Sequence, residues 1–218
     1  MLPTEPPEAI IFDWDGTLVD CWPSIHNAMN ATLEAMGHDT WTYEEMLARV
    51  RKSMRDAFPE MFGDRWEEAG RIFYEHVEAH HLEGTTVLGG AEDALAAANA
   101  AAPHVGVVSN KQGPLLRAEI DHLDWRGYIV RAVGAGDAAE DKPARAAMDL
   151  VLEETGIRPG VKVWYIGDTG IDMRFATACG CTGVLIGEKA FNANELGGIT
   201  YAAHFADLAA FTSVIAAQ

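Results

Sequence analysis

The sequence predicts an α/β protein in which a doubly wound parallel sheet carries a small α-helical domain inserted after the first strand. Apolar runs of strand length alternate with helix-length segments over the second half of the chain, as in βαβ units. Polar side chains directly follow several of these runs, where such sheets bind ligands. Residues 21–86, in contrast, contain helical patterns and no convincing strand.

The composition narrows the class of protein. The chain has 218 residues, of which 49% are hydrophobic, so it can bury a core and is not disordered. Its net charge of −17 argues against nucleic acid and anionic membranes as partners, because both require a basic surface. We see no signal-peptide or membrane-span pattern, and the three cysteines are too scattered for a disulfide framework. We therefore expect a cytoplasmic monomer or homodimer.

The first element is a buried strand over residues 9–12, followed by the aspartates Asp13 and Asp15 and then by Gly16. Residues two apart on a strand point to the same side, so both carboxylates face one way where the strand ends. Turn and helix-cap chemistry would explain one aspartate but not two. Such a pair can place a divalent cation, a nucleophile and a proton shuttle close together.

Helical patterns come next, at residues 23–36, 43–51, 54–61 and 64–81. They form the predicted helical domain, residues 21–86, which leaves residues 1–20 and 87–218 as the α/β core. Two connections at one edge of a core suggest a hinge, and a hinged domain can exclude water from a site.

The densest group of cations in this acidic chain lies at residues 49–55 of the predicted helical domain. It either binds the anionic end of a small substrate, with Arg51 and Arg55 as the candidates, or forms a solvated helix face paired with nearby acids. His76 and His80 are one helical turn apart, a spacing that can bind zinc. No further ligands converge on them in the sequence, so we expect an exposed helix face.

Further strands are expected at residues 105–108, 129–133, 161–166 and 183–186, with helices at 114–123, 143–155 and 172–179. Ser109, Lys142 and Asp168 follow the first three of these strands. Because the carboxyl ends of parallel strands meet at one edge of the sheet, we expect these side chains to lie near Asp13. Each is ordinary turn or cap chemistry when taken alone, but much less so together.

Four segments resemble, in order and approximate spacing, the motifs of the haloacid dehalogenase-like hydrolase superfamily: Asp13-x-Asp15-Gly16-Thr17, Ser109-Asn110-Lys111, Lys142-Pro143 and Gly167-Asp168-Thr169-x-x-Asp172. The helical insertion stands where subfamilies with a small helical cap have theirs, and members similar to phosphoglycolate phosphatase are the best match. The resemblance implies a Rossmann-like core, Mg²⁺ as cofactor, and a phosphatase that acts on a small phosphorylated metabolite.

The resemblance also implies a role for each residue. Asp13 would attack phosphorus and form an aspartyl-phosphate, while Asp15 would protonate the leaving oxygen and later accept a proton from water. Ser109 would hold phosphoryl oxygens and Lys142 would stabilise the crowded carboxylates. The predicted Mg²⁺ ligands are Asp13, Asp15 through its backbone carbonyl, Asp168 and Asp172, and the substrate-binding candidates of the core are Gly16, Thr17 and Asn110.

Two other functions stay open. Asp15 disfavours dehalogenases and phosphonatases, which lack an acid at this position, but a β-phosphoglucomutase-like sugar-phosphate mutase keeps both aspartates. Mutases of that kind usually have a hinge histidine where this chain has Ile25, with His26 one residue later. The second alternative is a non-catalytic phosphate-binding or regulatory protein, which would be expected to have lost Asp13 or Asp15.

Overall fold

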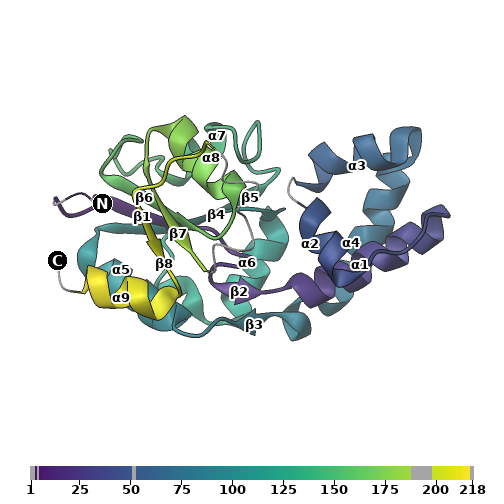
Figure 1. The fold of residues 1–218 in the computed structure, drawn as a ribbon, viewed down its shortest axis with the longest axis horizontal. Coiled ribbons are helices and arrows are strands. Elements are labelled where there is room, and N and C mark those ends of the chain that lie inside the picture. Colours follow the sequence, from purple (N-terminus) through teal and green to yellow (C-terminus); the bar gives the residue numbers. More distant parts are fainter. Residues whose placement is uncertain (1–2, 4, 51–52, 188–197, 217–218) are drawn as a thin grey trace. The chain divides into compact units, whose positions relative to one another are not determined.

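The computed structural model describes residues 3, 5–50, 53–187 and 198–216. The chain divides into two compact units (Figure 1). The core unit comprises Met1–Val19 and Val87–Gln218, and the helical unit comprises Asp20–Thr86. The chain passes between them through β2 (Val19–Asp20) and β3 (Thr86–Val87), which pair as a two-stranded sheet.

The core unit is built on a parallel sheet (Figure 1). Within the described residues this sheet has six strands, in the spatial order β5 (Arg131–Ala135), β4 (His104–Gln112), β1 (Ala9–Phe12), β6 (Val163–Gly167), β7 (Thr182–Ile186) and β8 (Ala203–Phe205). All neighbouring pairs run parallel. The central strands are buried apolar runs, as a sheet covered on both faces requires. The predicted α/β fold class is therefore confirmed.

Helices cover both faces of the sheet (Figure 1). They are α5 (Ala91–Ala101), α6 (Gly113–His122), α7 (Ala146–Val151), α8 (Gly170–Cys179) and α9 (Leu208–Ile215), with a 3₁₀ turn η2 (Trp125–Gly127). Helices α5 and α9 pack against each other on one face, where Phe211 meets the rings of Phe12 and Phe205 edge-on. Helices α7 and α8 cover the other face, and their side chains Met148 and Phe175 join one apolar cluster with the strands.

The strand order places the ends of β1 and β6 at the point where the sheet changes its winding direction. Phe12 pairs with Val107 of β4 and with Ile166 of β6. The chain moves toward β5 after β4 and toward β7 after β6. Loops therefore diverge beside β1, and the carboxyl ends of strands at such a point form the usual ligand crevice of this fold class.

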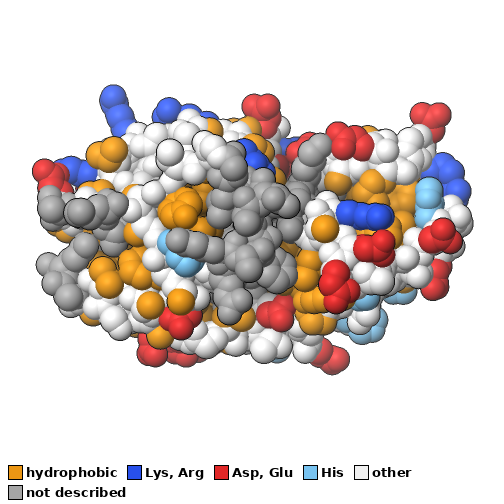
Figure 2. Space-filling view, viewed as in Figure 1, with side chains coloured by type: hydrophobic (Ala, Val, Ile, Leu, Met, Phe, Trp, Pro, Cys, Tyr) orange, Lys and Arg blue, Asp and Glu red, His pale blue; other side chains and the backbone are white. Residues whose placement is uncertain are grey.

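The helical unit has its own apolar core. It contains α1 (Trp22–Met36), α2 (Tyr43–Arg49), α3 (Met54–Phe62), the 3₁₀ turn η1 (Gly63–Arg65) and α4 (Trp66–Gly84). Helix α4 packs against α1 and α3, and Phe58 contacts the rings of Phe62 and Phe73 edge-on. Thr42 and Glu45 form a capping box at the start of α2. In the view of Figure 2, most of the charged side chains on the surface of this unit are acidic, in agreement with the net charge of −17.

Several elements differ from the expected ones. Helices α5 and α9 and strand β8 were not predicted, and β5 begins two residues later than expected because Ile129 still bonds to the carbonyl of Trp125 in the preceding turn. Helix α7 is much shorter than the predicted helix at residues 143–155, since a turn occupies residues 142–144. Among the described residues, no helix combines the length and the apolar character needed to cross a bilayer.

Replacing Phe211 with alanine should destabilise the core unit, because its fully buried ring fills the space between α9 and the sheet. We expect a loss of about 3–5 kcal/mol in the free energy of unfolding, measured by urea denaturation. Val214→Ala on the same helix is the control, since Val214 is 39% exposed and should change stability by less than about 1 kcal/mol. Equal losses for the two variants would contradict the packing described for α9.

A candidate active site with a carboxylate cluster

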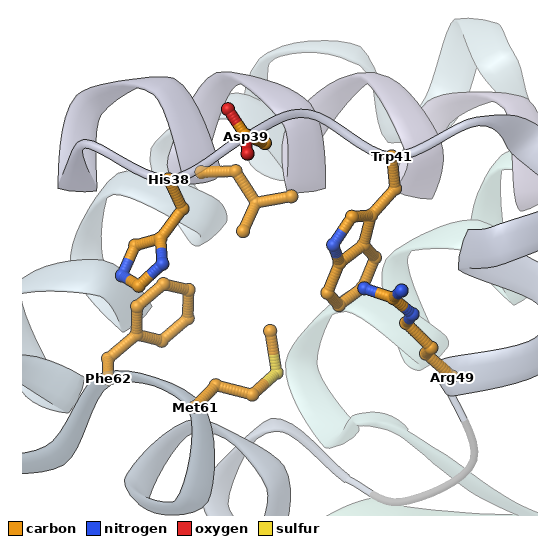
Figure 3. A pocket seen from close by; sticks show the side chains of 7 residues that line it. His38, Asp39, Trp41, Arg49, Met61 and Phe62 are labelled. Atoms are coloured by element: carbon orange, nitrogen blue, oxygen red, sulfur yellow. The ribbon is translucent and has the colours of Figure 1, made fainter.

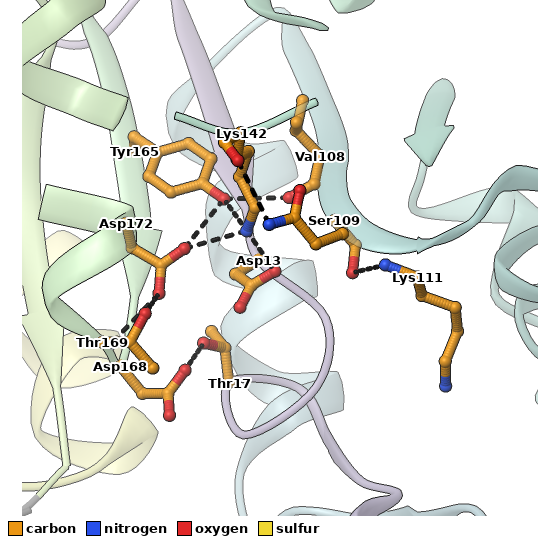
Figure 4. Close-up of polar contacts among 11 residues, drawn as sticks. Asp13, Thr17, Val108, Ser109, Lys111, Lys142, Tyr165, Asp168, Thr169 and Asp172 are labelled. Carbon is orange, nitrogen blue, oxygen red and sulfur yellow. Dashed lines mark hydrogen bonds and ion pairs between the residues drawn. The ribbon is translucent and has the colours of Figure 1, made fainter. Parts of the chain in front are cut away.

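Asp13 lies directly after β1 and is held there by a buried lysine (Figure 4). The Nζ atom of Lys142 lies 2.6 Å from Oδ1 of Asp13 and 2.9 Å from Oδ1 of Asp172. Its third proton goes to the hydroxyl of Tyr165, at 2.8 Å, and that hydroxyl in turn donates to the carbonyl of Val108. Burial by itself lowers the pKa of Lys142, but the two carboxylates outweigh burial and raise it. Lys142 therefore remains a cation.

Lys142 reaches this position from a turn rather than from a strand end. The turn begins at Asp141, whose carbonyl accepts a hydrogen bond from the amide of Ala144. The carboxylate of Asp141 accepts another from the amide of Gly136, after β5. Asn110, which follows Ser109 on β4, donates through Nδ2 to the backbone carbonyl of Lys142 at 3.3 Å. Asn110 thus helps to position the lysine, and its predicted contact with substrate stays a prediction.

Asp172 and Asp168 are placed by the start of α8. Thr169 and Asp172 form a capping box there, in which Oδ2 of Asp172 accepts hydrogen bonds from the amide and the hydroxyl of Thr169. Oδ1 of Asp172 is bonded to Lys142, so the whole carboxylate is engaged by the protein. Oδ1 of Asp168 accepts a hydrogen bond from the buried hydroxyl of Thr17 at 3.1 Å. Thr17 therefore orients Asp168, and its predicted contact with substrate stays a prediction.

Three carboxylates at this edge of the sheet could hold a metal ion. Asp13, Asp168 and Asp172 each offer an oxygen, and these oxygens all lie within 4.8 Å of one another. Burial, and then the charge of Asp172, raise the pKa of Asp13 to about 7, although Lys142 pulls it down. Burial and the same neighbouring acids also hold the pKa of Asp168 well above its usual value. Lys142 balances only one of the three carboxylate charges in this cluster. A divalent cation that prefers oxygen ligands would balance the other two.

Gly16 allows Asp168 to approach the turn after β1. Its φ is +86°, a backbone conformation that favours glycine, and a Cβ at this position would lie 2.5 Å from Oδ2 of Asp168. Gly16 was predicted to bind substrate, which stays a prediction. In the structure its backbone makes room for the Asp168 carboxylate, one of the three that could hold a metal ion.

Asp15 belongs to a second buried group. Its Oδ1 lies 2.9 Å from Nζ of Lys111, which is also bonded to both oxygens of Glu119 at 2.8 and 2.7 Å. The Asp15 carboxylate is thus turned to Lys111, and its predicted coordination of Mg²⁺ through the backbone carbonyl stays a prediction. Ser109 lies buried beside the site, and its Oγ accepts a hydrogen bond from the amide of Lys111 (Figure 4).

Sequence reasoning missed three residues of these two groups: Tyr165, Lys111 as a partner of Asp15, and Glu119. Tyr165 could have been found, because a tyrosine in a fully buried strand needs a partner for its hydroxyl. Glu119 also carries a signal, since it is a completely buried acid on an amphipathic helix. Which lysine pairs with which acid is visible only once the strands are ordered.

The cationic group of the helical unit is only partly described. Arg51 lies outside the described residues, and Arg55 is exposed on α3, so their predicted contact with substrate stays a prediction. Arg49 lies over the ring of Trp41, 4.7 Å from its centroid. These two line a pocket of about 300 Å³ within the helical unit (Figure 3), together with Leu33, His38, Asp39, Met61 and Phe62.

Within the described part of the chain, His76 and His80 of α4 show no metal-site geometry. His76 and His80 are both exposed, and a ring nitrogen of His80 lies 3.0 Å from the backbone carbonyl of His76. Neither belongs to a group of three potential ligands among the residues that the structure describes. This agrees with the exposed helix face expected from the sequence.

Comparisons with known proteins point to one family. The haloacid dehalogenase-like hydrolase family matches residues 10–186. The chain is 29% identical to a phosphoglycolate phosphatase of Chromobacterium violaceum over 199 residues, which cover 87% of this chain and 89% of the relative. A phosphoglycolate phosphatase of Salmonella choleraesuis is 30% identical over 203 residues, which cover 80% and 79%. The fold is similar to that of a haloacid dehalogenase-like family hydrolase from Streptococcus pneumoniae, with a TM-score of 0.82, 21% identity and coverage of 95% and 98%.

Gly16→Ala should weaken divalent-cation binding, because the added Cβ would collide with Asp168. We expect at least a tenfold rise in the dissociation constant for Mg²⁺ in titration calorimetry, given the typical effect of disturbing groups around a metal. Gly37→Ala is the matched control, since Gly37 also has a positive φ, +78°, but nothing lies within 4 Å of its added Cβ. Both variants should lose about 1 kcal/mol of stability from backbone strain, and only Gly16→Ala should lose affinity.

The stability of the metal-free protein should fall as the pH rises from about 4 to about 7. The folded-state pKa of Asp13 is about 7 against 3.8 for the free side chain, so the folded protein binds the proton more tightly than the unfolded chain does. Stability that is fully present below the unfolded pKa is therefore lost as the pH passes through the folded pKa, by a few kcal/mol. Urea denaturation across this range should give a flatter profile for Asp13→Asn and for wild type saturated with Mg²⁺. A wild-type profile no steeper than that of Asp13→Asn would contradict the raised pKa.

Proposed function

This chain belongs to the haloacid dehalogenase-like hydrolase family and is a phosphatase, and from this premise we propose that it acts with Mg²⁺ on a small phosphorylated metabolite, with phosphoglycolate as the first candidate. One arrangement carries the proposal. Asp13 lies 2.6 Å from Lys142 at the switch point of the sheet, beside the carboxylates of Asp168 and Asp172. Asp13 is thus held by a buried cation and lies among potential metal ligands. This environment suits a carboxylate that acts as the nucleophile on an anionic ester.

The donor set fits Mg²⁺, which prefers carboxylate oxygens. Asp13 and Asp168 would hold the ion, together with the backbone carbonyl of Asp15. When bound, the ion neutralises charge that repels an anionic ester and polarises the phosphate. Asp172 would orient the site, because both of its oxygens already accept hydrogen bonds from Lys142 and Thr169.

The residues of this chain would then divide the reaction between them. Lys142 holds one oxygen of Asp13 and so fixes the carboxylate for in-line attack on phosphorus. The bond between Asp13 and phosphorus forms as the bond to the ester oxygen breaks, and that oxygen takes a proton from Asp15. In the second half, Asp15 takes a proton from water as the water oxygen bonds to phosphorus and Asp13 departs. The products are the free alcohol and inorganic phosphate.

Ser109 and Asn110 would support the phosphoryl group from β4. Ser109 is buried beside Asp13, where its hydroxyl and nearby backbone amides can hold the transferring oxygens. Asn110 holds the backbone of Lys142. In the helical unit, Arg55 and Arg51 remain the residues predicted from the sequence to bind substrate.

Asp13→Asn should reduce phosphate release by at least about a thousandfold, because it removes the nucleophile. The measurement is release of inorganic phosphate from a panel of phosphorylated metabolites that includes phosphoglycolate, with Mg²⁺ and with EDTA. Asp149→Asn is the control, since Asp149 is 53% exposed on α7 and pairs only at the surface with Arg145.

Three outcomes separate the functions. Release that needs both Asp13 and Mg²⁺ supports the phosphatase, and the best substrate identifies its class. Conversion of glucose 1-phosphate to glucose 6-phosphate without release would instead establish the mutase. A folded protein that is silent in both assays would contradict the enzymatic proposal and leave a phosphate-binding or regulatory protein.

A further inference from the structure

Lys111 lies in a second buried ion cluster of the core unit and has no role in the reaction described above, although Asp15 of the same cluster does. Its side chain is only 6% exposed, and its Nζ lies 2.9 Å from Asp15 and 2.7 Å from the nearer oxygen of Glu119. Glu119 is completely buried and accepts a further hydrogen bond, at 2.6 Å, from the indole nitrogen of Trp14. Trp14 stands in the sequence between the two aspartates Asp13 and Asp15.

Each member of this cluster is held by a different element. Lys111 comes from β4, two residues after Ser109, and Glu119 comes from the buried face of α6. The ring of Trp14 is buried and packs edge-on against Trp125, with 5.8 Å between the ring centroids. The indole therefore has a fixed direction, and it fixes Glu119, which in turn fixes Lys111. Lys111 in turn donates a hydrogen bond to one oxygen of the Asp15 carboxylate.

A buried lysine at this position could bind phosphate, stabilise the fold as an ion pair, or orient Asp15, and the hydrogen bonds of Lys111 distinguish these three roles. A lysine that bound a phosphate would need protons directed at the substrate, but the Nζ of Lys111 already bonds to three carboxylate oxygens. A purely stabilising ion pair is a poor explanation, because burying two charges costs about as much as their attraction returns. Orientation of Asp15 remains, and it is a requirement of proton transfer, which depends on geometry before acidity.

We propose that Lys111, fixed by Glu119 and Trp14, is a positioning residue that orients Asp15 for proton transfer. Lys111 holds Oδ1, so the proton is carried by Oδ2 and moves from there to the ester oxygen as the phosphorus–oxygen bond breaks. In the second half Oδ2 regains a proton from the attacking water. Glu119 neutralises Lys111, so the lysine keeps its place whether or not Asp15 carries a proton. This inference rests on the phosphatase function proposed above.

The test compares two esters that differ in their need for an acid. Phosphoglycolate has a poor leaving group that must be protonated, whereas 2,4-dinitrophenyl phosphate has a leaving group that departs as the anion. The variant is Lys111→Met combined with Glu119→Gln, which removes the lysine together with the acid that neutralises it, so that Glu119 is not left as a buried anion without its lysine. Lys162→Met is the control, because Lys162 also pairs with two glutamates, Glu5 and Glu8, but at the surface.

We expect the double variant to lose about 10- to 100-fold in kcat on phosphoglycolate with little change in KM, which is part of the 10²–10⁴ that a general acid contributes. The initial burst of dinitrophenolate should keep its wild-type rate, and Lys162→Met should match wild type on both esters. Equal losses on both esters, or no loss on either, would overturn the proposal.

A crystal structure of the double variant separates this proposal from the proposed function. If wild type hydrolyses neither ester, the phosphatase function fails, and the position of Asp15 still decides the role of Lys111. An Asp15 carboxylate that has turned away or occupies several orientations supports positioning by Lys111. A carboxylate in its wild-type place shows that Lys111 does not position it.

Discussion

The ammonium group of Lys142 donates to Asp13, Tyr165 and Asp172 in a part of the core unit that water hardly reaches. Breaking a buried pair of this kind by removing one partner costs about 3–5 kcal/mol, because the other charge is left uncompensated. Both carboxylates face the lysine and raise its pKa, which keeps it charged. The end of β1, the turn at residues 142–144 and the capping box of α8 must therefore all be formed together before any of them can serve the site.

A second lysine extends the same principle to the second aspartate. Lys142 holds Asp13 and Lys111 holds Asp15, so the two carboxylates, two residues apart, do not share a cation. Each of the two aspartates thus has a cation of its own, although Asp13 shares Lys142 with Asp172. Trp14, the residue between the two aspartates, is itself held in place. Its ring packs against Trp125, and its indole nitrogen donates a hydrogen bond to Glu119. The proposed nucleophile, Asp13, and the proposed proton donor, Asp15, can thereby differ in environment although they are only two residues apart in the chain.

These local cations matter more in a chain that carries a net charge of −17. An anionic ester approaches an acidic molecule against its overall field, so attraction has to come from a few placed charges and from a bound metal. The carboxylate cluster repels an anion by itself, and the pKa of Asp13 is raised first by burial and then by the charge of Asp172. The divalent cation proposed above would reduce both effects at once, and would thereby couple stability, protonation and catalysis at a single cluster.

Much of this protein could be predicted from its sequence, because the relevant signals are local. The apolar run before Asp13, the spacing of Asp13 and Asp15, and polar residues after later strands predicted the α/β class and the edge of the sheet that holds the candidate site. Strand alternation and strand-end chemistry need only neighbouring residues. The tertiary structure alone decided which partners meet. Lys142 and Asp13 are 129 residues apart, and Thr17 and Asp168 are 151 apart. Their contacts follow from the order β5-β4-β1-β6 and its register, and so do the roles of Tyr165 and Glu119. A local pattern cannot specify that order, because it is set by how whole strands and helices pack.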